Sequence, residues 1–478
     1  MSVALPRGPR MSGSSGSRAR RRARTTFGQR VRTVASPAAA ALLLALAFVL
    51  PNASDADRSP APVTIDRSAY ACPAGSGVSV TAGQIVAGTS AIATSLPGRT
   101  PVESLGDATR WRRDTVDAAG VTVDQRGRGS GAVGFFSEAA GKAQGGGLAV
   151  GPCPPTADDN WFLGAGSGGK HLTTLVLTNL SSSPAVADLS FWGPAGRIDA
   201  VDASGVVVDP FTVRRVDLRD LAAGEAELAV RVERRRGSLT VAALDSSTSV
   251  FRGTDALEPT ARPRRAQVVA GMPSGSSTRT LLILNPSMST ARVGVEVVGQ
   301  KGTFAPEGLE SIKVDAGQLR AVSVPKSVGA VGAALRLRSD QPVAASVRVA
   351  PGTKDRAFAE AVPELDGAAV VPVDLGTGTR APELVLTAAG REASVTLEAY
   401  DEEMSRQGTT DVTVEAGTTK SLDLGAKALG AKNVAYVVVR AEGGVVGAAT
   451  YRRGAGIASL GLIEAPVTVL GPQVRPVG

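Results

Sequence analysis

The sequence LVLTN at residues 175–179 returns as LLILN at 281–285 and as LVLTA at 384–388, at spacings of 106 and 103 residues. Two further landmarks recur in the same order: VDP at Val208 with VDAG at Val314 and VEAG at Val414, and AALD at Ala242 with ASVR at Ala345 and ATYR at Ala449. Ordered landmarks at nearly constant spacing are typical of a tandem array. The sequence therefore predicts three copies of one module.

Within a module, apolar residues alternate with polar ones. Val293, Val295 and Val297 follow this period of two, and similar runs recur six or seven times per copy, broken by Gly, Pro, Asn or Ser. Such runs indicate short strands with one buried face. About seven of them in about a hundred residues favour an all-β fold of tandem immunoglobulin-like β-sandwich modules.

The landmarks and composition shifts give module boundaries. We expect repeats at 155–256, 266–352 and 368–470, joined by linkers at 254–266 and 351–367. Residues 62–154 are rich in Gly and hold both cysteines, Cys72 and Cys153, so we expect a diverged β module there. In an oxidising compartment such a pair most often forms a disulfide, which stabilises by about 4 kcal/mol in the chain-entropy model. Two free buried thiols are the alternative.

The N-terminal region has the pattern of an export signal. Residues 1–35 contain nine Arg and no acid, and an unbroken apolar run follows at 38–50. We expect a disordered cytoplasmic tail and, at 36–56, an uncleaved transmembrane anchor. A cleaved signal peptide, leading to secretion, is the next alternative, and a buried core helix is a third.

The remainder of the chain is close to neutral. Without the nine tail arginines, 43 basic residues face 44 acidic ones, which argues against a nucleic-acid-binding face.

The stretch GAGSGGKHLTT at 164–174 differs by one residue from a phosphate-binding loop. Such a loop requires a helix after it, whereas here TTLVLTNL continues with β-branched, alternating residues. We predict a hairpin turn and expect neither a nucleotide nor another cofactor.

Candidate catalytic residues are few. The only histidine, His171, lies in that predicted turn, and the acid pairs at 158–159 and 402–403 are typical of solvated positions. One His and two Cys give no zinc cluster. Trp111, Trp161 and Trp192 could stack on a sugar ring, but packing in cores or at domain junctions is the favoured interpretation.

The segment with Cys153, Pro154, Trp161 and Phe162, followed by the L-x-L-x-N strand end and the turn between Gly193 and Gly196, resembles an actinobacterial family of envelope proteins with a domain of unknown function. The resemblance implies an extracytoplasmic, single-pass or secreted protein. It carries over no catalytic residue.

From these observations we expect a non-enzymatic, membrane-anchored scaffold or interaction protein of the cell envelope, with envelope proteins or cell-wall glycan as partners. A cell-wall glycan-binding protein is the first alternative, and a glycan hydrolase is the second.

Overall fold

The structure, a computed structural model, describes residues 62–470 apart from gaps at 85–89, 106–109, 128–130, 140–146, 249–252, 276, 327, 329–331, 352–354, 377–378 and 466–467. The described residues form strands, turns and two short 3₁₀ segments, Val201–Ala203 and Leu218–Asp220, which confirms the all-β prediction. No helix in this part of the chain is long and apolar enough to cross a bilayer. The predicted tail at 1–35 and the predicted anchor at 36–56 lie outside the described residues.

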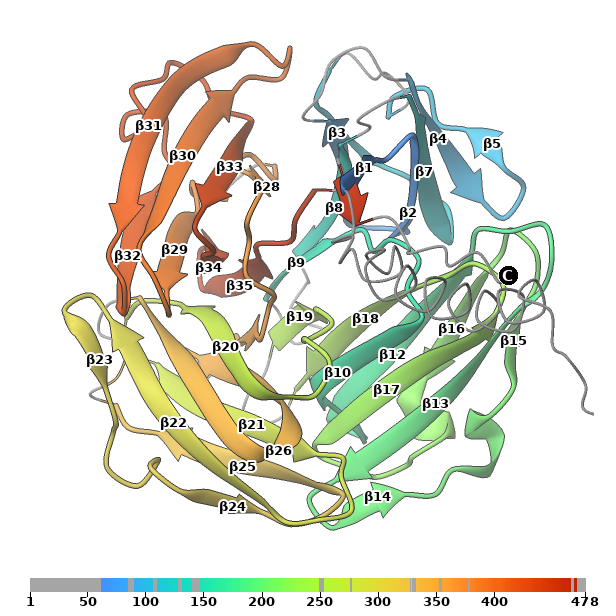
Figure 1. Ribbon diagram of the computed structural model, residues 1–478. Helices are drawn as coiled ribbons and strands as arrows, with labels where there is room; N and C mark the ends of the chain where they lie inside the picture. The colour runs from blue at the N-terminus through green and yellow to red at the C-terminus, as the bar shows by residue number, and fades with distance from the viewer. Residues whose placement is uncertain are drawn as a thin grey trace, which may run out of the picture. The chain divides into compact units, whose positions relative to one another are not determined.

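The strands form four successive pairs of sheets (Figure 1). The first pair consists of β2 (Arg67–Pro73), β3 (Val78–Gln84), β4 (Ser90–Leu96), β5 (Thr100–Pro101), β6 (Arg112–Thr115), β7 (Gly120–Arg126), β8 (Ala132–Ala139) and β9 (Leu148–Pro152). The second consists of β10 (Asp159–Ala165), β11 (Ser167–Gly168), β12 (His171–Asn179), β13 (Ala185–Gly193), β14 (Gly196–Ile198), β15 (Val206–Val208), β16 (Val213–Asp217), β17 (Leu228–Arg236), β18 (Leu239–Ser247) and β19 (Gly253–Leu257).

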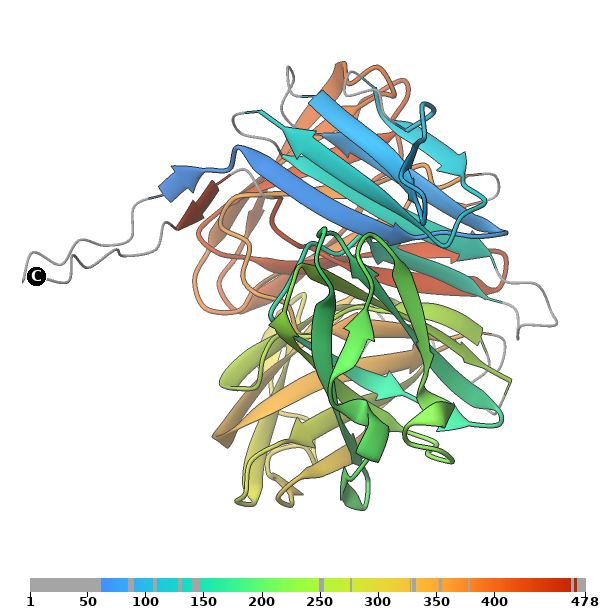
Figure 2. The ribbon, with the colours of Figure 1, turned by 90° about the vertical axis from the view of Figure 1, so that its right-hand side faces the viewer.

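The third pair consists of β20 (Arg264–Met272), β21 (Thr278–Asn285), β22 (Ala291–Gly299), β23 (Gly302–Phe304), β24 (Ile312–Val314), β25 (Gln318–Val324), β26 (Ala333–Ala350) and β27 (Ala357–Glu360). The fourth consists of β28 (Ala368–Pro372), β29 (Glu383–Ala388), β30 (Ala393–Tyr400), β31 (Arg406–Val414), β32 (Thr418–Asp423), β33 (Tyr436–Glu442), β34 (Val446–Arg453) and β35 (Gly456–Gly461). A separate two-stranded ribbon pairs β1 (Pro62–Thr64) with β36 (Thr468–Leu470), as Figure 2 shows.

All four pairs share one strand order. Apart from the short extra strands β11, β15 and β24, each pair has eight strands in chain order. In the first sheet of each pair, the strands lie side by side in the order first, sixth, third and fourth. In the second sheet, the order is fifth, second, seventh and eighth. In the third pair the sixth and seventh strands are one continuous strand, β26, which passes from one sheet to the other.

This order differs in part from the immunoglobulin arrangement. The pairing of the second strand with the fifth, and of the third with the sixth, is the immunoglobulin pattern. The first and seventh strands have exchanged sheets, because the first pairs with the sixth and the seventh pairs with the second. The paired sheets are consistent with β-sandwiches, and we call them the first to fourth sandwich.

The recurring strand-end asparagine explains one sequence landmark. Asn179 is fully buried, and its Nδ2 donates to the carbonyl oxygens of Ser183, Val208 and Asp209 at 2.8, 3.0 and 3.1 Å. Its Oδ1 accepts from the backbone N–H of Ser181 at 2.9 Å. One side chain thus ties the turn after the second strand to the VDP landmark, 29 residues further on.

The third sandwich repeats this arrangement. Asn285 donates to Ser289, Val314 and Asp315 and accepts from the Ser287 N–H, with the same sequence offsets. In the fourth sandwich Ala388 stands at this position, and its carbonyl oxygen accepts from the Gly417 N–H at 2.7 Å.

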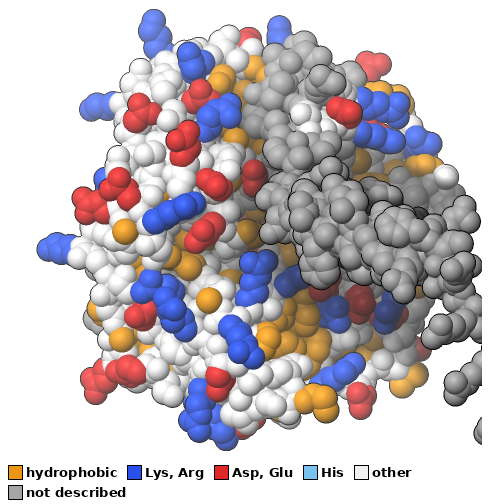
Figure 3. Space-filling view, in the orientation of Figure 1, with side chains coloured by type: hydrophobic (Ala, Val, Ile, Leu, Met, Phe, Trp, Pro, Cys, Tyr) orange, Lys and Arg blue, Asp and Glu red, His pale blue; other side chains and the backbone are white. Residues whose placement is uncertain are grey.

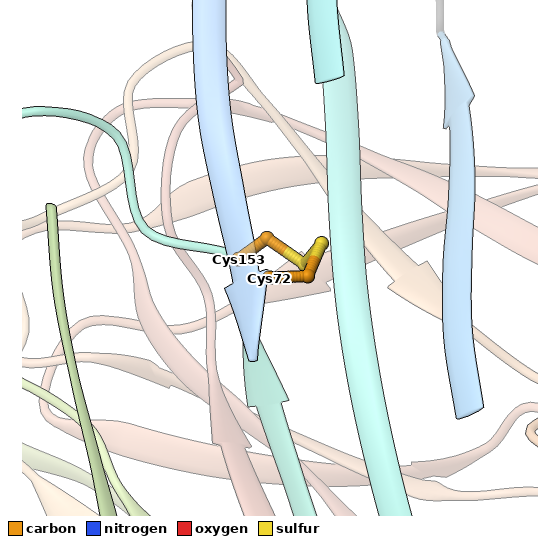
Figure 4. The surroundings of a disulfide bond; sticks show 2 residues. All are labelled: Cys72 and Cys153. Carbon is orange, nitrogen blue, oxygen red and sulfur yellow. A yellow bond between two sulfur atoms is a disulfide. The ribbon is translucent and has the colours of Figure 1, made fainter. Parts of the chain in front are cut away.

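The two cysteines form the predicted disulfide (Figure 4). Cys72 on β2 is joined to Cys153, which directly follows β9, so the bond connects the first strand to the end of the first sandwich. Gly134 on β8 lies against it, since a Cβ at that position would be 3.1 Å from Cys153 Sγ.

The eighth strands β9, β19, β27 and β35 meet one another. Each of them contacts at least two of the others, and β19 and β35 contact all three. Two of these strands lie in stretches that the sequence analysis treated as linkers: β19 begins at Gly253, and β27 spans Ala357–Glu360. We call this meeting point the strand junction.

Candidate functional site

The loop that resembles a phosphate-binding motif is a hairpin. Ser167 pairs with Leu172 and Gly168 with His171, and β12 follows directly, so the predicted hairpin turn is confirmed. A Cβ at Gly166 would lie 2.3 Å from the His171 ring, which explains why glycine is needed there. Gly164 has φ +90° at a break in strand register and lies against Phe358 of the third sandwich.

His171 belongs to a buried charged cluster at the junction. Its Nε2 lies 3.0 Å from Asp245 Oδ1, and its Nδ1 lies 2.7 Å from the carbonyl oxygen of Ala226. Both neighbours are acceptors, so only the doubly protonated ring satisfies both contacts at once. The hydroxyl of Thr173 also donates to Asp245 Oδ1, at 2.5 Å.

Arg356 of the third sandwich donates from Nη2 to Asp245 Oδ2 of the second. Arg356 is 1 % exposed and Asp245 is fully buried. Burial would raise the pKa of Asp245, but the charges of Arg356 and His171 outweigh it and hold that pKa below its usual value. The cluster therefore acts as an internal ion pair that joins two sandwiches.

Asp355 connects the beginnings of the eighth strands. Its Oδ2 accepts from the backbone N–H groups of Leu148 on β9 and Ile457 on β35, at 3.1 and 2.6 Å. A Cβ at Gly253, where β19 begins, would lie 2.1 Å from Asp355 Oδ1. One carboxyl group of the third sandwich therefore lies against the other three.

The acids at this end have raised pKa values. Burial raises the pKa of Asp355 to about 7. The pKa of Asp255, whose Oδ2 accepts from the Phe358 N–H, lies well above its usual value because of burial and then the nearby charge of Asp355. Among the described residues, no three His, Cys, Asp or Glu side chains are grouped so that they could hold a metal ion.

A second pair of acids lies at the other end of the eighth strands. Glu258 follows β19 and accepts from the Gly461 N–H of β35 at 3.1 Å, while Glu360 ends β27. Burial raises the pKa of Glu258 to about 8, and burial with the charge of Glu258 raises that of Glu360 well above its usual value.

An apolar pocket of about 140 Å³ adjoins Glu258. It lies between the first, second and fourth sandwiches, and Phe136, Cys153 and Leu257 are among its lining residues. Glu464 also lines it. The pocket is smaller than the usual 300–1,000 Å³ of small-molecule sites.

The three tryptophans pack within the protein. Trp111 is 4 % exposed and stacks on Tyr436 of the fourth sandwich, with ring centroids 4.3 Å apart. Trp161 and Trp192 are each 6 % exposed and stack on one another at 5.4 Å. None of the three presents an open ring face for a sugar.

The acid pairs named from the sequence are separate from the junction. Asp159 accepts from Arg231 Nε at 2.7 Å and from Trp161 Nε1 at 3.1 Å, and Asp158 pairs with Arg234. Glu402 and Glu403 lie exposed in the turn after β30. Asp255, Glu258, Asp355 and Glu360 were missed because they stand in the stretches 254–266 and 351–367, which the sequence predicts to be linkers.

A family model described as "Family of unknown function (DUF5719)" matches residues 112–425, more than half of the chain. The chain belongs to this family. The DUF5719 match begins at β6 of the first sandwich and ends just after β32 of the fourth, so it includes the junction residues Asp255, Glu258, Asp355 and Glu360. It confirms the predicted domain of unknown function. No curated protein matches the chain.

Proposed function

We propose that this DUF5719 protein is a non-enzymatic interaction scaffold held outside the cytoplasm by an N-terminal anchor. Two observations support the location: the basic segment followed by the apolar run at 38–50, and the closed disulfide between Cys72 and Cys153. Disulfides persist in oxidising compartments, so the two observations agree. The resemblance to an actinobacterial envelope family supports the same location.

The observation that carries the interaction role is the edge strand β31. It has nine residues, pairs on one side only, with β30, and most of its side chains are exposed or half-buried. An open edge of this length offers a row of backbone N–H and C=O groups to an extended partner segment. We therefore propose that a protein partner adds a strand at β31.

The contacts of His171, the chain's one histidine, support a non-enzymatic role. Both ring nitrogens of His171 contact protein acceptors, and the ring is 7 % exposed. The buried ionic groups at the junction join sandwiches to one another.

Affinity capture from detergent-solubilised envelopes tests the proposal. The full-length protein should return a reproducible protein partner, and Thr409→Lys with Asp411→Lys on β31 should remove it, because lysines on an edge strand oppose strand addition. Ala321→Lys with Ser323→Lys on the edge strand β25 is the matched control, since both positions are exposed. Capture of no partner, or equal loss in both variants, would contradict the proposal.

A glycan hydrolase remains a second candidate because Glu258 and Glu464 line one pocket and the pKa of Glu258 is raised, as a general acid requires. The small volume of the pocket counts against it. Release of reducing sugar from isolated cell wall, abolished by Glu258→Gln, would favour the hydrolase over the scaffold.

A further inference from the structure

A groove of about 500 Å³ lies between the third and fourth sandwiches. Its lining includes Arg264 on β20 and Arg336 and Arg338 on β26, with Glu364 as an acidic lining residue. Figure 3 shows Lys and Arg side chains over the part of the surface that β20, β22 and β26 occupy in Figure 1.

The cross-strand neighbours of Arg338 are uncharged, so they cannot neutralise its positive charge. In the sheet register it lies opposite Gly294 on one side and Ala266 on the other. Arg338 and Arg264 are exposed, and neither has a hydrogen bond or ion pair with another described residue. Arg336, by contrast, pairs with Glu296, at 2.7 Å.

The second sandwich supplies a comparison within the same chain. There Arg231 corresponds to Arg336, and the positions of Ala266 and Arg338 are taken by Asp159 and Glu233. Both acids contact Arg231, at 2.7 and 3.1 Å. The same sheet face is therefore neutralised in the second sandwich and positive in the third.

In the first and fourth sandwiches, arginines on this face also have acidic partners. In the fourth, Arg440 pairs with Glu398 at 2.8 Å, and in the first, Asp124 pairs with Arg67 at 2.5 Å. In the third sandwich, Arg264 and Arg338 have no such partner among the described residues, and both line the groove.

The remaining groove lining is suited to a sugar ring. Val268 and Val362 give it apolar surface. Gln267 also lines it and is 9 % exposed, and its Nε2 donates to Val343 O.

We propose that this groove binds an acidic carbohydrate, in which sugar rings carry carboxylate or phosphate groups. The guanidinium groups of Arg264 and Arg338 bind the anionic group, since planar guanidinium matches carboxylate and phosphate geometry. The apolar surface contacts the ring. The inference does not depend on the strand-addition partner at β31, and the two sites can be tested separately.

Calorimetric titration of the purified full-length protein tests the groove. Galacturonate hexamer, glucose 6-phosphate, inorganic phosphate and maltohexaose serve as probes, so that carboxylate, phosphate, a bare anion and a neutral glycan are compared. One of the two acidic sugars should bind more tightly than inorganic phosphate, and maltohexaose should not bind.

Arg338→Glu should weaken the acidic sugar by at least about tenfold, because a charge-assisted pair is replaced by repulsion. This variant is expected to fold, since Glu233 occupies the corresponding position of the second sandwich. Arg265→Gln is the matched control: Arg265 is exposed on β20, next to Arg264, and does not line the groove.

Three outcomes would overturn the proposal. The first is binding of maltohexaose as tight as that of the acidic sugars. The second is binding of inorganic phosphate as tight as that of both acidic sugars. The third is a loss of affinity in Arg265→Gln equal to that in Arg338→Glu. Absence of binding by every probe would likewise reject it, while leaving the capture experiment at β31 unaffected.

Discussion

Asn179 and Asn285 occupy the same buried position in the second and third sandwiches, and each makes a matching set of hydrogen bonds. The sequence marks this position as the end of a repeated strand. It does not reveal that the side chain reaches 29 residues along the chain to the VDP or VDAG landmark. That contact depends on how the strands fold back, so it was found only in the structure.

Asn285→Ala should lower the free energy of unfolding by about 2–4 kcal/mol, because buried carbonyl groups lose their donor. Urea unfolding of the purified protein, followed by circular dichroism, measures this. Ser183→Ala is the control. In the second sandwich, the asparagine donates to the backbone oxygen of Ser183, and this substitution leaves that oxygen in place. A change below about 0.5 kcal/mol in Asn285→Ala would contradict the role assigned to the asparagine.

Hydrophobic alternation in the sequence predicts some of the strands and not others. Alternation predicted strands such as β22 because one face of each is buried. It missed two of the eighth strands, β19 and β27, since every residue of both is buried and both are short, so neither alternates. Their acids, Asp255 and Glu360, resemble solvated linker residues in the sequence, which is why the candidate site was not predicted.

The glycines of the hairpin at β11 and β12 give a test at this scale. Gly166→Ala should destabilise the protein by about 1–3 kcal/mol, because the new Cβ would displace His171 from Asp245. Gly169→Ala should be nearly neutral, as nothing lies within 4 Å of a Cβ there. A phosphate-binding loop would need Gly169, the glycine before Lys170, whereas the hairpin needs Gly166. Thermal unfolding of the two variants therefore distinguishes the hairpin from the phosphate-binding loop. Greater sensitivity at Gly169 would contradict the hairpin.

At the scale of the whole molecule, the four sandwiches meet around carboxyl groups that are protonated more readily than usual. The pKa values of Glu258 and Asp355 are raised to about 8 and about 7. The folded state then holds more protons than the unfolded state between about pH 4 and pH 8. Stability is therefore fully present at low pH within this window and falls as pH rises through it.

Glu258→Gln should flatten this dependence, since the amide keeps an acceptor for the Gly461 N–H but does not ionise. Near pH 9 the variant should be more stable than the wild type by up to about 4 kcal/mol, with little difference near pH 5. Chemical unfolding across this range measures it, with Glu402→Gln in an exposed turn as control. A wild-type stability that rises from pH 5 to pH 8 would contradict the assignment.

The disulfide of the first sandwich links the fold to its proposed location, because a disulfide that persists in the living cell requires an oxidising compartment. Alkylation of free thiols in intact cells, followed by mass measurement of the native protein, tests this claim most directly. The account predicts that neither Cys72 nor Cys153 is alkylated until a reductant is added. Alkylation of both cysteines without reductant would contradict it.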